Sequence, residues 1–239
     1  MAGHTSTLSC DRLAENLMQF ANKIIIADDH PLFRTAMQQA VKQLLPQAKI
    51  EQAESLQDLQ RLVEEQHDAD LILLDLHMPG AHGFSGLAYL RTHFPHIPVV
   101  VVSACEEVEV MHQAVDHEAS GYIPKSSSLD EIAKAISQVL DGDIYLPALA
   151  QRHQHQPNQA ALDLAKRIAS LTPQQFRVLG MMSEGLLNKQ IAYDLDVSEA
   201  TIKAHVTAIF RKLDVRTRTQ AVIAVQSLDL DKTSEQIPL

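Results

Sequence analysis

Five polar residues in the N-terminal half of the chain each follow a short apolar run: Asp28, Asp29, Asp75, Ser103 and Lys125. Three carboxylates brought to one place repel each other unless a cation joins them. Carboxylate oxygens in small number suit Mg²⁺, which keeps some of its water and shares phosphate oxygens. A lysine and a hydroxyl opposite them can hold the remaining phosphoryl oxygens. The set predicts a site that attaches a phosphoryl group to a carboxylate, with Asp75 as the central candidate.

The apolar runs before these residues predict five β-strands. The expected strands are Lys23–Ala27, Lys49–Ala53, Leu71–Leu74, Val99–Val102 and Gly121–Ile123. Helical patterns alternate with them at Leu32–Leu45, Ser55–Gln66, Ser85–Phe94, Val108–His117 and Leu129–Leu140. This alternation, with strands rich in Val, Ile and Leu, predicts a doubly wound, five-stranded parallel sheet covered on both faces. The carboxyl ends of such strands face one crevice, so the polar residues should converge there.

Taken singly, each of these residues has a plainer explanation. An Asp after a strand is usually a turn or cap residue, and Asp28 and Asp29 stand directly before a His-Pro pair that could open a helix. Ser103 and Lys125 carry no meaning alone. The matching order of all five strand ends favours the phosphoryl site.

The C-terminal part of the chain is helical throughout. Thr172 begins a first helix, Gln175 closes a capping box with it, and Gly185 ends that helix. Asn188 is expected to cap a second helix that runs to Leu195, and Ser198 a third. A fourth helix is expected from about residue 219 to 226. The residues before the first of these helices, 147–170, are expected to form a polar linker in which residues 160–169 make a short helix.

The third of these helices has an apolar stripe and an opposite polar face. The stripe consists of Ile202, Val206, Ile209 and Leu213. The opposite face carries Ala200, Lys203, Ala204, Thr207 and Arg211. Joined to the second helix by the brief Asp196-Val197 turn, it makes a helix-turn-helix candidate. Lysine can donate to guanine, and the methyl groups of Thr and Ala can meet that of thymine.

Basic residues around this helix are candidate phosphate contacts that would fix position rather than sequence preference. They are Lys189, Arg211, Lys212, Arg216 and Arg218. The alternative is a solvated helix face, which is the usual place of exposed Lys and Arg.

Four motifs carry a family resemblance in the N-terminal part: IIIADDHPLFR at 24–34, LLDLHMPG at 73–80, VVSA at 101–104 and GYIPK at 121–125. By these motifs, residues 23–146 resemble the receiver domain of bacterial two-component response regulators, which has a flavodoxin-like fold. The resemblance implies that Asp75 accepts a phosphoryl group from a histidine of a sensor kinase. It also implies that Mg²⁺ is held by Asp28, Asp29, Asp75 and the backbone carbonyl of His77.

The resemblance assigns the remaining residues to the switch. Lys125 would contact the phosphoryl group, Ser103 would move its hydroxyl toward it, and Tyr122 would rotate inward. The surface of the fourth helix, fifth strand and fifth helix should respond. A phosphatase of the haloacid-dehalogenase type is a poor match, because it needs a second Asp at the position of His77.

The C-terminal motifs resemble a second family. They are Leu171–Pro173, Glu184–Leu186, Asn188–Ala192, Val197–Val206 and Arg211–Val215. By these segments, residues 171–228 resemble the four-helix DNA-binding domain of the LuxR/NarL type. The resemblance implies that Lys203, Ala204 and Thr207 face bases, that Lys189, Thr201 and Arg211 also contact DNA, and that the last helix contributes a dimer contact. Members with a basic residue at the position of Thr207 differ here, so the preferred DNA sequence stays open.

Composition fits a packed protein of two domains. The chain has 239 residues, 46% of them hydrophobic and 21% charged, which excludes overall disorder. No apolar run approaches the ~20 residues of a membrane helix, and no secretory signal stands at the start. Two cysteines, Cys10 and Cys105, cannot form a disulfide framework. A cytoplasmic protein is expected.

The net charge of −10 is unevenly distributed. The part up to residue 146 is strongly acidic, whereas residues 171–226 are slightly basic, which suggests two domains with different partners. The expected division is a 1–22 extension, a 23–146 receiver, a 147–170 linker, a 171–228 DNA-binding domain and a 229–239 tail.

The combined prediction is a phosphorylation-dependent transcription regulator of the NarL/FixJ type that is not an enzyme. Its expected partners are a sensor histidine kinase, promoter DNA, a second copy of the chain and RNA polymerase, with no membrane partner. Three alternatives stay open: a regulator that acts without phosphorylation, an enzyme acting on a small phosphoester, and a protein-interaction module that no longer reads DNA.

Overall fold

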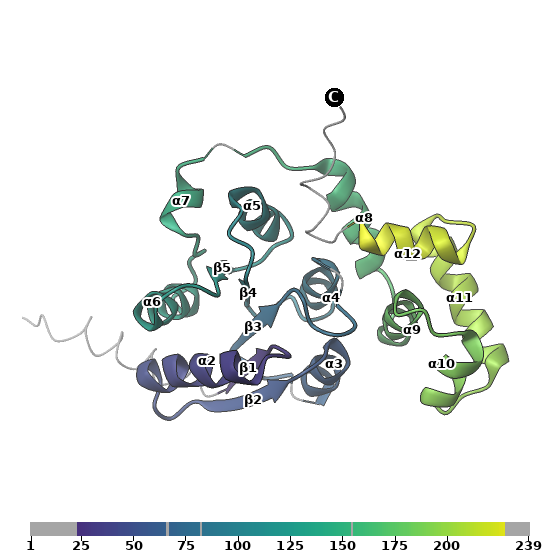
Figure 1. Cartoon of the computed structure of the whole chain (residues 1–239), viewed down its shortest axis with the longest axis horizontal. Helices are drawn as coiled ribbons and strands as arrows, with labels where there is room; N and C mark the ends of the chain where they lie inside the picture. The colour runs from purple at the N-terminus through teal and green to yellow at the C-terminus, as the bar shows by residue number, and fades with distance from the viewer. Residues whose placement is uncertain (1–22, 66, 82, 154, 228–239) are drawn as a thin grey trace, which may run out of the picture.

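The structure is a computed structural model that describes residues 23–65, 67–81, 83–153 and 155–227, so the expected 1–22 extension and 229–239 tail lie outside the described residues. The first half alternates strands and helices (Figure 1). The strands are β1 (Lys23–Ala27), β2 (Lys49–Ala53), β3 (Leu71–Asp75), β4 (Val99–Ser103) and β5 (Gly121–Pro124). The helices are α2 (Pro31–Leu44), α3 (Leu56–Glu65), α4 (Ser85–His93), α5 (Val108–Asp116) and α6 (Leu129–Leu140).

The five strands form one parallel sheet in the order β2-β1-β3-β4-β5. This is the flavodoxin-like order, so the predicted fold of the first half is confirmed. Three strands run one residue further than expected, so Asp75 and Ser103 are themselves the last residues of β3 and β4. Asp75 pairs with Val102, and Ser103 pairs with the last residue of β5. The strand ends that carry the polar residues therefore lie side by side.

The sheet buries both of its faces. Alternate residues of the central strands point in opposite directions, so each strand contributes to two apolar cores. The core that includes Ile24 and Ile26 is covered by α2 and α6. The core that includes Ile25 and Ile72 is covered by α3, α4 and α5, and it continues without interruption into the C-terminal half.

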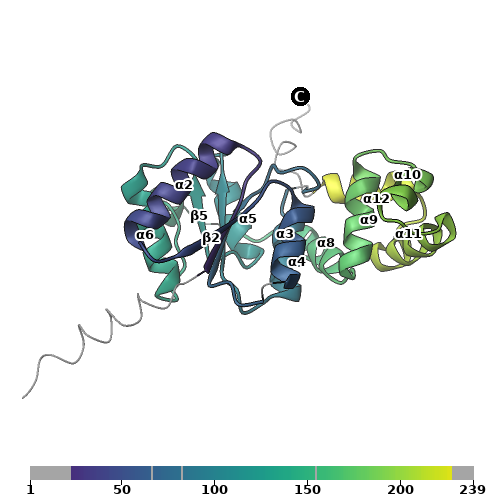
Figure 2. The same cartoon turned by 90° about the horizontal axis from the view of Figure 1, so that it is seen from below.

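The C-terminal half is entirely helical. Its elements are α7 (Ala148–Gln151), α8 (Gln159–Ala169), α9 (Pro173–Ser183), α10 (Asn188–Asp194), α11 (Glu199–Leu213) and α12 (Arg218–Gln226). Helices α9 to α12 form the predicted four-helix domain, while α8 packs against both α4 and α11 (Figures 1 and 2). The α7 helix was not predicted, because four residues are too few to show a helical repeat.

Two of the predicted helix caps are confirmed and one is wrong. Thr172 and Gln175 form the expected capping box of α9, and Ser198 accepts a hydrogen bond from the Thr201 amide at the start of α11. Asn188, however, is the first residue of α10 rather than its cap. The N-cap residue of α10 is Leu187, whose amide donates to the side chain of Gln190.

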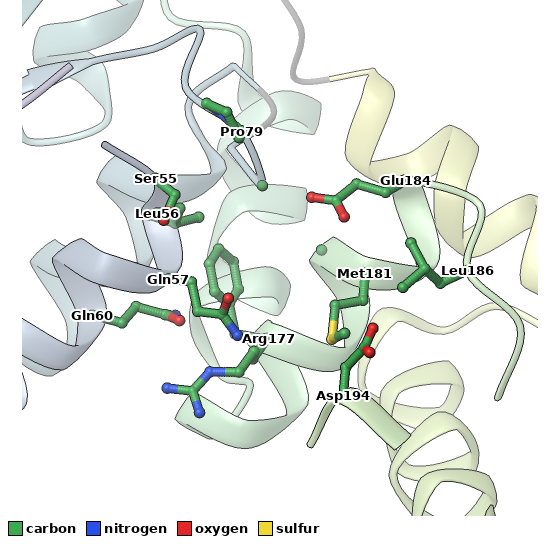
Figure 3. A pocket seen from close by; sticks show the side chains of 13 residues that line it. Ser55, Leu56, Gln57, Gln60, Pro79, Arg177, Met181, Glu184, Leu186 and Asp194 are labelled. Carbon is green, nitrogen blue, oxygen red and sulfur yellow. The ribbon is translucent and has the colours of Figure 1, made fainter. Parts of the chain in front are cut away.

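The two halves meet where α3, α4 and the loop after β3 face α9. The ring of Tyr89 stacks on that of Phe176 with centroids 4.6 Å apart. A Cβ atom at Gly180 would lie 3.4 Å from the carbonyl oxygen of Gly80, so the two backbones approach closely here. Beside this contact lies a cavity of about 340 Å³, lined by residues that include Leu56, Arg177 and Glu184 (Figure 3). Within the described part of the chain, no helix is long and apolar enough to cross a membrane.

Candidate functional site

Three carboxylates gather at the carboxyl ends of β1 and β3. Asp28 and Asp75 are buried, with 2% and 1% of their surface exposed, and Asp29 is half-buried beside them. One ligand atom from each of Asp28, Asp29, His30 and Asp75 falls within a group whose members all lie within 4.8 Å of one another. The predicted convergence of the acidic residues is therefore present in the structure. Neither Asp caps α2, whose N-cap residue is His30.

Lys125 joins two of these carboxylates. Its Nζ lies 2.6 Å from Oδ2 of Asp28 and 2.9 Å from Oδ2 of Asp75. Burial opposes the charge of the lysine, but the hydrogen bonds to Asp28 and Asp75 outweigh it, so the pKa of Lys125 is raised. The ammonium group also lies 4.8 Å from the centre of the Phe33 ring. Lys125 is therefore a fixed positive charge directly beside Asp75.

The charges of this cluster suit a divalent cation. Three carboxylates face one ammonium group, and carboxylate oxygens are the ligands that Mg²⁺ prefers. His30, which the sequence reasoning did not single out, places Nδ1 2.6 Å from Oδ1 of Asp29 and 3.4 Å from Oδ1 of Asp28. The backbone amide of His77 donates to Oδ1 of Asp75 over 3.2 Å. Coordination of Mg²⁺ by the His77 carbonyl stays a prediction.

Ser103 and Tyr122 are both fully buried next to the cluster. The hydroxyl of Ser103 accepts a hydrogen bond from the Cys105 amide, 3.2 Å away. The hydroxyl of Tyr122 donates to the Cys105 carbonyl over 2.7 Å, and burial raises the pKa of Tyr122. Tyr122 already points inward in this structure, whereas the resemblance implied an inward rotation only after phosphorylation, and it is tied to the loop of residues 104–107 that leads into α5.

Arg34 holds the backbone at Asp28, next to Asp29, and its role was not predicted from the sequence. The buried guanidinium donates to the backbone carbonyl of Asp28 over 2.7 Å and to Oε1 of Gln52 over 3.1 Å, and it pairs with Glu54. It therefore fixes the end of β1 to β2. Its place one helical turn after His30 could have suggested that it reaches back toward the strand ends.

The exposed face of α11 is the second candidate site. Ile202, Ile209 and Leu213 are buried and Val206 is partly buried, as the apolar stripe predicts. The predicted outer face is exposed in the whole molecule at Ala200, Lys203, Ala204, Thr207 and Arg211. The first half of the chain therefore leaves this face uncovered.

Polar contacts along α11 constrain two of these side chains. Lys203 forms an ion pair with Glu199 at 2.9 Å, and the Thr207 hydroxyl donates to the Lys203 carbonyl. Thr201 and Lys189 are exposed near the helix-turn-helix. These residues are accessible to a ligand, as the expectation requires.

Two of the expected phosphate contacts also donate hydrogen bonds to backbone carbonyls of the protein. The guanidinium of Arg218 donates to the carbonyls of Met182 and Leu186, and burial lowers the pKa of Arg218. Arg218 therefore joins α12 to the end of α9, while its contact with a DNA phosphate stays a prediction. Lys212 donates to the carbonyl of Ser170 over 2.6 Å. Arg211 and Arg216 remain exposed.

Comparison with known protein families assigns both halves. Residues 24–137 match the family described as "Response regulator receiver domain". Residues 169–225 match the family described as "Bacterial regulatory proteins, luxR family".

Two relatives match most of the chain. The "Glycerol metabolism activator" of Pseudomonas putida is 43% identical over 215 residues, which cover 87% of this chain and 96% of the relative. The "Nitrate/nitrite response regulator protein NarL" of Escherichia coli K12 is 32% identical over 84% of this chain and 94% of the relative.

A solved structure shares the fold of the chain. RcsB of Salmonella enterica serovar Typhimurium, bound to a promoter, is 23% identical and covers 87% of this chain and 99% of its own, with a TM-score of 0.52. Together with the family matches and the relatives, these similarities show that the chain belongs to the transcriptional response regulators, which join a receiver domain to a LuxR-type DNA-binding domain.

Proposed function

We propose that this regulator is switched by phosphorylation of Asp75 and that the phosphorylated form controls promoter binding. The observation that carries the proposal is the position of Lys125, whose ammonium group bridges the carboxylates of Asp28 and Asp75 at neighbouring strand ends. A sensor histidine kinase supplies the phosphoryl group. The receiver takes residues 23–146, the linker 147–170 and the DNA-binding domain 171–228.

The side chains around Asp75 have separate tasks in this reaction. The Oδ atoms of Asp28, Asp29 and Asp75 and the carbonyl of His77 would hold Mg²⁺, which neutralises phosphoryl oxygens when bound. A carboxylate oxygen of Asp75 attacks phosphorus, and the kinase histidine leaves. Lys125 stays against the new phosphoryl group because its charge is fixed beside Asp75.

The added charge then acts on the residues next to the site. The acyl phosphate carries about −1.5 to −2 charge where the carboxylate carried −1, and it brings three strong acceptor oxygens. The Ser103 hydroxyl turns toward these oxygens and releases the Cys105 amide, while Tyr122 keeps its inward position and its bond to the Cys105 carbonyl. The loop 104–107 therefore passes the change to α5.

The DNA-binding domain reads promoter DNA through α11. Lys203, Ala204 and Thr207 face base edges, and Lys189, Thr201 and Arg211 contact the backbone. Two copies, joined in part through the exposed Ile223 on α12, place two such helices about one helical turn apart on DNA. The regulator acts in the cytoplasm, with RNA polymerase as a further partner.

Phosphoryl transfer is tested with Mg²⁺ and a small acyl-phosphate donor, followed by a phosphate-affinity gel. We expect a shifted band for the wild type and for the control Asp68→Asn, whose carboxylate is exposed and distant from the cluster. Asp75→Asn should show no shift. A shift that persists in Asp75→Asn would place the acceptor elsewhere, and a complete lack of shift would favour a regulator that acts without phosphorylation.

DNA reading is tested by binding to promoter fragments at several salt concentrations. A DNA-binding protein loses affinity as salt rises, because phosphate contacts release counterions. Arg211→Ala should weaken binding to all sequences and lower the salt dependence, whereas Lys203→Ala should mainly reduce discrimination between sequences. Binding that does not depend on salt would favour the protein-interaction module.

A further inference from the structure

A second cluster of titratable residues lies where the linker between the two domains contacts α5. His155 belongs to the segment between α7 and α8, and its side chain is only 8% exposed. It rests against α5, where Nδ1 lies 3.2 Å from Oε2 of Glu109 and Nε2 lies 2.6 Å from Oδ2 of Asp116. A polar linker thus has one nearly buried ring held by two carboxylates of the receiver.

The geometry determines the protonation state of this ring. A carboxylate oxygen can only accept a hydrogen bond, so each ring nitrogen of His155 must carry a proton to satisfy the oxygen it faces. A neutral imidazole has one N–H group and would turn a lone pair toward one of the two carboxylates. The docked arrangement therefore requires the imidazolium form.

A second histidine supports the contact. The ring of His112 on α5 stacks on that of His155 with centroids 4.8 Å apart and an angle of 4°. Nε2 of His112 lies 3.0 Å from the carbonyl oxygen of Ala150 in α7, so this nitrogen carries the proton. The linker is thus attached to α5 at two places, of which only the contact at His155 needs an added proton.

No other described charge comes close to the ring. Glu109 and Asp116 are the acidic groups that face it, and His112 is the stacked neighbour. On the linker side, Arg152 and His153 are exposed, and the ring of His153 contacts the Leu149 carbonyl. Burial opposes the charge of His155, but its hydrogen bonds to Asp116 and Glu109 outweigh it, so the pKa of His155 is raised.

We propose that His155 is a proton-dependent latch that fastens the interdomain linker to α5 when doubly protonated and releases it after losing a proton. A histidine whose pKa is raised by docking contributes fully below its undocked pKa of 6.5, and the contribution is lost as pH rises through the raised pKa. The attachment therefore tightens in mildly acidic conditions and loosens in mildly alkaline ones.

The latch acts on the helix that the phosphorylation switch is expected to move. Glu109 is the second residue of α5, and the Cys105 carbonyl that holds Tyr122 stands three residues before this helix. The latch itself does not depend on phosphorylation of Asp75. It is therefore tested on the unphosphorylated full-length protein, where failure of the proposed function has no effect on the outcome.

The test is hydrogen exchange of the backbone in residues 148–157 at pH 6 and pH 8, corrected for the intrinsic exchange rate at each pH. Loss of the two ion pairs to the ring should make the protection at pH 6 about two- to thirtyfold greater than at pH 8. His155→Gln should lose this pH dependence and show low protection at both values. His153→Gln, two residues away, is the matched control and should behave like the wild type.

A second variant removes the partners instead of the ring. In Glu109→Gln with Asp116→Asn, the ring titration of His155 followed by NMR should shift to lower pH, because the two carboxylates that raise its pKa are gone. Equal protection of the wild-type linker at both pH values would overturn the proposal. So would a His155→Gln protein that keeps the wild-type pH dependence.

Discussion

Arg34 is the residue that most directly positions the acidic pair without touching a ligand. We predict that Arg34→Lys keeps the positive charge but loses the planar fork that spans the Asp28 carbonyl and Gln52. Loss of such a supporting contact typically costs 10- to 100-fold in metal affinity, so the Mg²⁺ concentration needed for phosphorylation should rise roughly tenfold. A Mg²⁺ titration of the acyl-phosphate reaction measures this.

The control for Arg34 is Arg61→Lys, because Arg61 forms an exposed ion pair with Asp58 on α3. Its Mg²⁺ requirement should match that of the wild type. Circular dichroism should show the same helix content in both variants. An unchanged Mg²⁺ midpoint in a folded Arg34→Lys protein would contradict the positioning role.

His117 should make the receiver less stable in acid. Burial lowers the pKa of His117 from 6.5 to about 4, with Asp116 opposing the shift, and its ring lies tilted against that of Phe84 with centroids 4.8 Å apart. The unfolded chain binds the proton first, so stability is present above pH 6.5 and is lost as pH falls toward 4. Between pH 7 and pH 5 this residue should lower the free energy of unfolding by about 2 kcal/mol.

Urea unfolding of the receiver at pH 7 and pH 5 measures this loss. His117→Phe keeps an aromatic ring against Phe84, so the loss should shrink in this variant. The exposed His96 provides the control, since His96→Gln should keep the wild-type loss. The same loss in all three proteins would show that His117 is not the titrating group.

Single residues of the acidic site were predictable where the strand ends dictated their place. Asp28, Asp75, Ser103 and Lys125 stand at or directly after the ends of buried strands that must meet at one edge, so their convergence follows from topology. The contacts of Arg34 and His155 were not predictable. Each depends on how far a long side chain reaches across another element, which spacing along the chain does not show.

At the scale of the element, α11 depends on the cap at its N-terminus. Ser198→Ala removes the acceptor of the Thr201 amide, which should cost about 1 kcal/mol in the free energy of unfolding of the DNA-binding domain. The affinity for DNA should fall as well, because Lys203 stands directly after the first turn of α11, which the cap stabilises. Chemical unfolding and promoter binding measure the two effects.

Ser198→Thr restores an acceptor at the same position, so it should return most of the lost stability. A Ser198→Ala protein with the stability of the wild type would show that the cap does not stabilise α11.

The sequence predicted α11 well because the cap and the apolar stripe of this helix agree. The predicted start of α10 was wrong, because Asn188 is a residue type that often caps helices but is here the first residue inside the helix.

At the scale of the whole molecule, the loop that follows Asp75 reaches the second domain. Gly80, five residues after Asp75, adopts a φ of +79° and presents its carbonyl to Gly180 of α9. A glycine suits this backbone conformation, which other residues rarely adopt. The site and the contact between the domains are therefore parts of one short segment.

We predict that Gly180→Leu separates the two domains without unfolding either of them. A larger side chain meets the backbone at Gly80, and overpacking of this kind costs about 1–3 kcal/mol. Replacing a helical glycine also favours the helix, so α9 should stay folded. Small-angle X-ray scattering should show a larger radius of gyration.

Gly180→Ala is the graded control, because its Cβ would lie 3.4 Å from the Gly80 carbonyl and requires only a small shift. It should stay compact. A Gly180→Leu protein with the wild-type radius of gyration would show that this contact does not hold the domains together.

The two domains were predictable from the change in charge and in hydrophobic pattern along the chain. Their contact was not predictable, because Tyr89 and Phe176 look like ordinary core residues in the sequence.

The double packing of α8 affects how this molecule can be divided and recombined. Because α8 contacts both α4 and α11, a fragment that begins at Leu171 lacks α8 with its buried Ala165 and Ile168, and it leaves bare the surface of α11 that α8 contacts. The transferable unit therefore begins at Asn158, the cap of α8. Grafted onto another receiver, that unit brings an apolar helix that needs a matching α4, so exchange of output domains in evolution would be restricted to receivers that supply one.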